Sequence, residues 1–173
     1  MSSPSTSLSG HVVSVTPVKQ KYTNWCWAAC CEMFAKHHGF TRYDQYQFVA
    51  TVLGGKPPDT DGRDSTSIFN SAAGPKDFIA LLRNALPTAK YVEYVDVTGQ
   101  AQARFPESAI RKFLDDNRIM MYGSGNHAKI LCGYGVKGGE EMLVAIDPEA
   151  AGPVPVAWTD FNTCAWIVYR PKS

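Results

Sequence analysis

Cys26 is the residue with the clearest potential for chemistry. It stands between Trp25 and Trp27 in "NWCWAACC", at the predicted start of a helix. The first backbone amides of a helix lack intrahelical partners and its dipole is positive there, so this position stabilises a thiolate. Cys30 and Cys31 lie beyond the first turn, where the dipole no longer acts. The position predicts Cys26 as a nucleophile; the alternative is a small buried side chain.

A thiolate nucleophile needs a histidine that moves a proton to the leaving group. The chain has four histidines. His11 lies in a predicted flexible leader, and His37 and His38 lie at the far end of the Cys26 helix, about 16 Å away at 1.5 Å per residue. His127 follows the glycine-rich "GSGN" and opens the predicted strand "HAKILCGYG". We therefore predict His127 as the base, against a structural histidine at a strand start.

Asp147 is the predicted partner of this histidine. It ends the predicted strand "EMLVAID", which follows the strand that His127 opens. A hairpin between the two strands would bring Asp147 and His127 to one edge, where a carboxylate orients the imidazole ring. Asn162 and Asp160 are alternatives for this role, and Asp147 would then be only a turn residue.

Gln20 is the predicted donor for the oxyanion of a tetrahedral intermediate. It precedes Cys26 by six residues, and its side-chain amide and the Cys26 backbone amide would act together. The alternative is a solvated side chain. A zinc site built from the clustered cysteines with His37 or His38 fits no closed tetrahedral spacing. We therefore expect no metal and no organic cofactor.

The elements that must position these residues change character along the chain. Asn24 is a good helix cap and Gly39 a good helix stop, and apolar residues on two faces of the helix between them predict a buried central helix. The predicted helices are 25–38, 43–54, 75–86 and 106–117, and the predicted strands are 90–97, 118–123, 127–135, 141–147 and 164–170. The sequence predicts an α+β protein in which a helical part, about 17–87, packs on an antiparallel β-rich part, about 88–173.

Composition limits the classes of function. The 173 residues are 45% hydrophobic, and 17 basic against 16 acidic residues give a net charge of +1, so no nucleic-acid or membrane partner is indicated. No apolar run approaches the roughly 20 residues of a membrane helix. Residues 1–16 are predicted to be a flexible leader or linker, and residues 56–74 a surface loop.

Location is predicted from the N-terminus and the cysteines. The Ser-rich start has no basic or apolar segment typical of a signal peptide. Five cysteines do not form a disulfide framework, and free thiols fit a reducing compartment. We expect a cytoplasmic protein, or one delivered into the cytosol of a target cell by a specialised secretion system.

The motifs together resemble the papain-like cysteine protease superfamily. "Q-x5-C-W" before a helix, a late His that opens a strand and an Asp that ends another are similar to its compact bacterial branch. That branch includes plant-pathogen effector proteases and the double-glycine leader peptidases of bacteriocin exporters. "GNHAKILCGYG", "IDPEA" and the spacing of Trp158, Phe161 and Trp166 carry the likeness. Asn126 departs from it, since the branch often has Gly directly before His, and the loop 56–74 has no counterpart.

This resemblance implies a papain-like fold whose Cys–His–Asp triad lies between a helical and a β lobe. It implies a cysteine peptidase that cleaves a protein substrate through a thioester, as a bacterial effector or toxin. It also implies a preference for Gly-Gly sites and a neutralising immunity protein. Two alternatives stay open, a transglutaminase or deamidase that acts on glutamine side chains and a noncatalytic interaction module.

Overall fold

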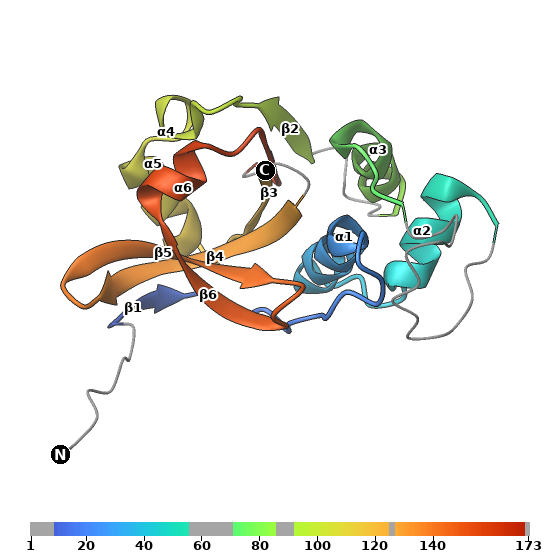
Figure 1. The fold of residues 1–173 in the computed structure, drawn as a ribbon, viewed down its shortest axis with the longest axis horizontal. Helices are drawn as coiled ribbons and strands as arrows, with labels where there is room; N and C mark the ends of the chain where they lie inside the picture. The colour runs from blue at the N-terminus through green and yellow to red at the C-terminus, as the bar shows by residue number, and fades with distance from the viewer. Residues whose placement is uncertain (1–8, 56–70, 86–91, 125–126, 172–173) are drawn as a thin grey trace, which may run out of the picture.

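The computed structural model describes residues 9–55, 71–85, 92–124 and 127–171 (Figure 1). It combines helices with an antiparallel sheet, so the predicted α+β class is confirmed. The described helices are α1 (Cys26–His37), α2 (Gln45–Leu53), α3 (Pro75–Ala85), α4 (Ala101–Arg104), α5 (Glu107–Asp115) and α6 (Trp158–Asn162). The strands are β1 (Ser9–Val12), β2 (Glu93–Asp96), β3 (Met120–Ser124), β4 (His127–Lys137), β5 (Glu140–Asp147), β6 (Gly152–Ala157) and β7 (Trp166–Tyr169). Most of the loop predicted at 56–74, together with Asn126, lies outside the described residues.

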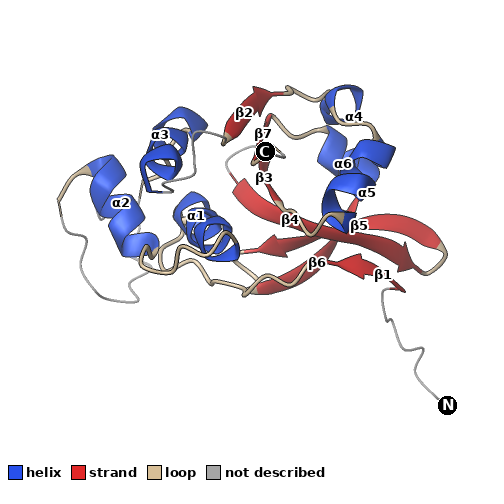
Figure 2. Ribbon diagram, turned by 180° about the vertical axis from the view of Figure 1, so that it is seen from behind, coloured by secondary structure: helices blue, strands red, loops and turns tan. Residues whose placement is uncertain are grey.

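The sheet is built around β4. Its strands follow the order β2-β7-β3-β4-β5-β6, and all their pairings are antiparallel. β5 pairs with one edge of β4, while β3 and then β1 pair with the other edge. Helices α1–α3 gather at one end of the molecule and α4–α6 lie around the other end of the sheet (Figure 2).

Helix α1 is the central helix that the sequence predicts. Every residue from Cys26 to Ala35 is buried, and the helix packs against β4 and β3. Glu32 ties it to α2, because its carboxylate accepts from the Gln45 backbone amide at 3.0 Å and pairs with Lys36 at 2.5 Å. The predicted cap was wrong. Trp25 occupies the N-cap position without a side-chain capping hydrogen bond, and its ring is buried in the core.

The flexible leader predicted for residues 1–16 was wrong over its second half. Ser9–Val12 form β1, which pairs with β4. His11 Nε2 lies 3.0 Å from the backbone oxygen of Leu114, and Val13 is buried. The strands approach closely because Gly10 has no side chain, and a Cβ there would collide with the backbone of Tyr134. The Ser-rich composition therefore hid a strand whose partner is distant in sequence.

The sequence also missed β6 and α6. β6 carries Pro153 and Pro155, and proline cannot donate to a sheet ladder, so strand patterns with proline read as loops. β6 lies at the edge of the sheet, where the backbone groups on the outer side of the strand need no partner strand. Within the described part of the chain, no helix has the length and apolar character that crossing a membrane requires.

Candidate active site

Cys26 is the first residue of α1 and lines a cavity of about 270 Å³ between the helical part and the sheet. Its side chain is nearly buried, with 6% of its surface exposed. Small residues from the segment 72–75 form one wall, and the start of β4 forms another. Trp27 and Trp166 complete the lining. A reactant in this cavity would meet the Cys26 sulfur beside largely apolar walls.

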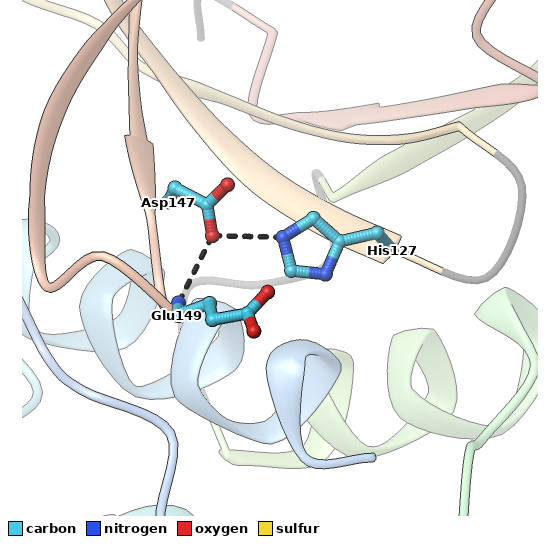
Figure 3. Close-up of side chains that lie close together, drawn as sticks. All are labelled: His127, Asp147 and Glu149. Atoms are coloured by element: carbon cyan, nitrogen blue, oxygen red, sulfur yellow. Dashed lines mark hydrogen bonds and ion pairs between the residues drawn. The ribbon is translucent and has the colours of Figure 1, made fainter. Parts of the chain in front are cut away.

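His127 lines the same cavity, because β4 begins where it packs against α1. Its Nε2 donates to Asp147 Oδ1 at 2.8 Å (Figure 3). A side-chain hydrogen bond with Cys26 is the largest cause that raises the pKa of His127. Burial lowers this pKa, the Asp147 carboxylate raises it, and the result is a pKa of about 9 against an ordinary 6.5. The ring therefore carries a positive charge at neutral pH, with a partner on each side.

Asp147 ends β5 at the edge where β4 begins, so the predicted hairpin geometry is confirmed. The strands are antiparallel, with Ile130 opposite Ile146, so this register continues to Lys129 opposite Asp147. His127 lies two residues before Lys129 on the same face of β4, where it reaches Asp147 diagonally. Burial alone raises the pKa of the Asp147 carboxyl. Hydrogen bonds from the Glu149 amide, His127 and Lys129 outweigh that effect and hold the pKa below its ordinary value.

Three donors fix the Asp147 carboxylate. Oδ1 accepts from His127 and from the Glu149 backbone amide at 2.9 Å, while Oδ2 lies 3.1 Å from Lys129 Nζ. Only 15% of the side chain is exposed. The carboxylate therefore cannot rotate without losing a charged partner, and it holds the His127 ring in one orientation.

Gln20 is not brought to Cys26 by the described hydrogen bonds. Its side-chain Nε2 donates to the backbone oxygens of Tyr22 at 3.1 Å and Thr23 at 2.8 Å, so both amide hydrogens are used at the entry to α1. Its Oε1 is buried, and among the described residues it has no partner. Gln20 is also missing from the lining of the Cys26 cavity. Its oxyanion role stays a prediction.

The alternative partners of His127 lie elsewhere. Asn162 Oδ1 accepts from the Gln102 backbone amide at 2.9 Å, which caps the start of α4. Asp160 lines a neighbouring cavity of about 370 Å³ that reaches His127 from the other side. Asp147 is therefore the acid whose hydrogen bond to His127 the structure contains.

The other cysteines are core residues, as predicted. Cys30, Cys31, Cys132 and Cys164 are fully buried, and the five cysteines form no disulfide. Burial raises the pKa of the thiols of Cys30 and Cys31 well above its ordinary value, and it raises the pKa of Cys132 and Cys164 to about 12. These four thiols stay protonated at neutral pH, so they are poor nucleophiles.

The potential metal ligands differ from those of the zinc site considered from the sequence, which combined the clustered cysteines with His37 or His38. Among the described residues, the side chains that gather closely enough to hold an ion are His127, Asp147 and Glu149, with ligand atoms within 4.8 Å of one another. Figure 3 shows the exposed Glu149 carboxylate beside the His127 ring. No cysteine belongs to this group. His127 and Asp147 already satisfy each other by a hydrogen bond, so the group reads as part of the Cys26 site.

Sequence reasoning missed Lys129, Glu149 and the segment 72–75. Lys129 is two residues after His127 on β4, so strand alternation places both on one face. This spacing could have predicted that Lys129 lies near the site. Glu149 follows Asp-Pro, and its amide donates to Asp147 in the local turn that Asp favours. The segment 72–75 carries no chemical side chain, and only the packing of Trp27 and Trp166 around it reveals its place.

The comparisons with known proteins give no family. No model of a protein family matches the chain, and no curated protein matches it. The site therefore stands on the positions of Cys26, His127 and Asp147 at one cavity.

Proposed function

We propose that this chain is a cysteine peptidase of papain-like fold that cleaves a peptide bond of a protein substrate. One observation carries the proposal. His127 hydrogen-bonds Asp147 through Nε2 and shares a second side-chain hydrogen bond with Cys26, at the wall of a cavity that both residues line. A buried nucleophile, a base and an orienting carboxylate in that order constitute the arrangement that acyl transfer requires.

The reaction follows from the charges of these groups. The Cys26 thiolate attacks the carbonyl carbon of the scissile bond and pushes the carbonyl electrons onto oxygen. The tetrahedral intermediate collapses to a thioester, and the His127 imidazolium gives its proton to the departing amine. Water then attacks the thioester carbonyl, and His127 takes a proton from that water. The C–S bond breaks, the carboxylic acid product leaves, and the Cys26 thiolate beside the His127 imidazolium is restored. Asp147 stabilises the imidazolium in both halves.

The oxyanion would be stabilised by the Cys26 backbone amide and by Gln20. Cys26 begins α1, and the first amides of a helix point out of its hydrogen-bond ladder. Gln20 would have to exchange its carbonyl partners at Tyr22 and Thr23 for the oxyanion when substrate enters.

A preference for Gly-Gly sites is proposed from the family resemblance. The cavity of about 270 Å³ is lined by the small residues Ala72, Ala73, Gly74 and Ala128 together with Trp27 and Trp166.

The biological role is proposed from the resemblance alone. It is that of a bacterial effector or toxin delivered into the cytosol of a target cell, with an immunity protein as its natural inhibitor. No cofactor takes part in the proposed reaction.

New protein N-termini in cells that express the chain test the proposal directly. Wild-type protein should generate new N-termini that Cys26→Ala protein does not, because the nucleophile is gone. Cys164→Ala is the matched control, since that thiol is buried away from the cavity, and it should keep the cuts. Identical N-termini in wild-type and Cys26→Ala cells would contradict a peptidase. A gain of about one dalton or a crosslink in a target would assign the same site to glutamine side chains instead.

A further inference from the structure

A second cavity lies at the opposite end of α1 from Cys26. It has a volume of about 340 Å³, within the usual range of roughly 300–1,000 Å³ for small-molecule sites. Three segments form it, namely His37 and His38 of the last turn of α1, the turn at residues 117–119, and Arg170 with Pro171. We call it the distal pocket. Cys26 and His37 are about 16 Å apart along the helix at 1.5 Å per residue, so the distal pocket is separate from the candidate active site.

Hydrogen bonds hold the walls of the distal pocket together. His37 Nε2 lies 3.1 Å from the Asn117 backbone oxygen, which joins the end of α1 to the turn before β3. Arg118 donates to the Arg170 backbone oxygen at 2.7 Å, which joins that turn to the end of β7. The Arg118 guanidinium also lies over the Phe113 ring, 3.7 Å from its centroid. The pocket is therefore fixed before any ligand enters.

The charges of the distal pocket are of one sign. Arg118, Arg170 and the two histidines line it, and no acidic side chain of the part of the chain that the structure describes does so. Among the described residues, the Arg170 guanidinium forms no ion pair and no hydrogen bond. Asp116 is the acidic group whose charge acts on Arg118, and it lies outside the lining. Two guanidinium groups without an acid in the same cavity leave positive charge that an anion would compensate.

His38 is the second unusual group at the distal pocket. Its Nε2 is buried and has no hydrogen-bond partner among the described residues, which is rare for a polar atom in a protein interior. Burial lowers the pKa of His38, and the positive charges of His37, Arg170 and Arg118 lower it further, to about 4. The ring is therefore neutral at neutral pH beside two guanidinium groups, whose charge an anion would offset.

We propose that the distal pocket binds the phosphate group of a small phosphorylated molecule through Arg118 and Arg170. Guanidinium groups match the geometry and charge of a phosphate, and several phosphate oxygens can be paired at once. The volume exceeds what a bare phosphate group fills, and Pro171 provides apolar surface for the rest of the ligand. This binding is independent of the proposed peptidase activity.

Isothermal titration of the purified chain with pyrophosphate tests the inference, with sodium acetate at equal ionic strength as the control ligand. Wild-type protein should bind one pyrophosphate saturably, and acetate should not bind. Arg170→Gln should weaken binding about ten- to a hundredfold, because a charge-assisted contact to the anion is lost. Arg42→Gln makes the same change of charge on an exposed side chain outside the pocket, and its affinity should stay at the wild-type value.

Two further variants keep the outcome decisive. Arg170→Lys keeps the charge without the guanidinium fork, so it should bind with intermediate affinity. Cys26→Ala should bind pyrophosphate as wild type does, whether or not the chain proves to be a peptidase. Thermal melts identify any variant that fails to fold. The absence of saturable binding by folded wild-type protein would overturn the inference, and so would equal losses in Arg170→Gln and Arg42→Gln.

Discussion

His127 uses its two ring nitrogens for different partners, and this arrangement sets the expected pH dependence. The hydrogen bond with Cys26 and the bond to Asp147 raise its pKa to about 9, although burial lowers it. The leaving amine needs the proton of this imidazolium, so kcat/KM should fall as the pH rises through about 9. A pH profile of cleavage of a mapped substrate checks this limb.

The same pH profile, measured with Asp147→Asn, tests whether the alkaline limb belongs to His127. The Asp147 carboxylate raises the pKa of His127, so its neutral replacement should move the alkaline limb to lower pH. An alkaline limb that stays in place in Asp147→Asn would mean that another group controls it.

Asp147 variants should differ from each other in rate. Asp147→Asn keeps a carbonyl acceptor for His127 and should retain partial activity. Asp147→Ala leaves the ring free to rotate and should lose a larger part of the roughly 10²–10⁴-fold contribution of general acid–base catalysis. Cleavage rates beside thermal melts provide the test. Wild-type rates in a normally folded Asp147→Ala protein would exclude Asp147 from the mechanism.

Gln20 has two possible roles that one variant separates. If its amide turns toward the oxyanion, Gln20→Ala should lower kcat by on the order of a hundredfold and leave substrate binding nearly unchanged. If its hydrogen bonds to Tyr22 and Thr23 only brace the entry to α1, the variant should melt at a lower temperature with normal kcat. A normal kcat would remove Gln20 from the mechanism.

At the scale of elements, the sequence predicted best where pattern and packing agree. The helix at 106–117 has Ile110, Phe113 and Leu114 on one face, and all three are buried in α5. The strands that carry His127 and Asp147 also alternate clearly, so their hairpin and the contact between the two residues were predictable. Local signals sufficed for these elements.

The rest depended on contacts between distant segments. β1 pairs with a strand more than 120 residues later in the chain. Its serine and glycine are not typical of strands, so the local sequence does not predict it. β6 carries prolines that only an edge position tolerates. The hydrogen bonds of Gln20 depend on the path of the backbone at Tyr22 and Thr23, which no spacing rule predicts.

β1 offers a test of its own, because Gly10 allows the close approach to β4. A side chain at this position meets backbone atoms of Tyr134 and Gly135, which cannot move aside cheaply. Gly10→Val should therefore lower the free energy of unfolding by about 1–3 kcal/mol. Denaturant melts of Gly10→Val beside Ser9→Val, an exposed neighbour, measure the difference. Equal stability of the two variants would contradict the pairing of β1 with β4 and support the flexible leader that the sequence predicts.

At the scale of the whole molecule, the fold places the candidate active site where the helical part meets the sheet. The buried helix α1 presents Cys26 at one end, and the β4–β5 pair presents His127 and Asp147 to the same cavity. The other end of α1 closes the distal pocket. One helix therefore connects the two cavities, and a ligand at the distal pocket would stabilise the element that positions the nucleophile.

Competitive alkylation of the five cysteines tests the central claim without knowledge of a substrate. Limiting iodoacetamide at neutral pH, followed by peptide mapping, should label Cys26 first, because Cys26 lines the cavity beside the positively charged His127 while the other four thiols are fully buried and protonated. His127→Ala should slow the labelling of Cys26 at unchanged fold. Preferential labelling of Cys132 or Cys164 in the folded protein, or an unchanged Cys26 rate in His127→Ala, would contradict an activated Cys26–His127 pair.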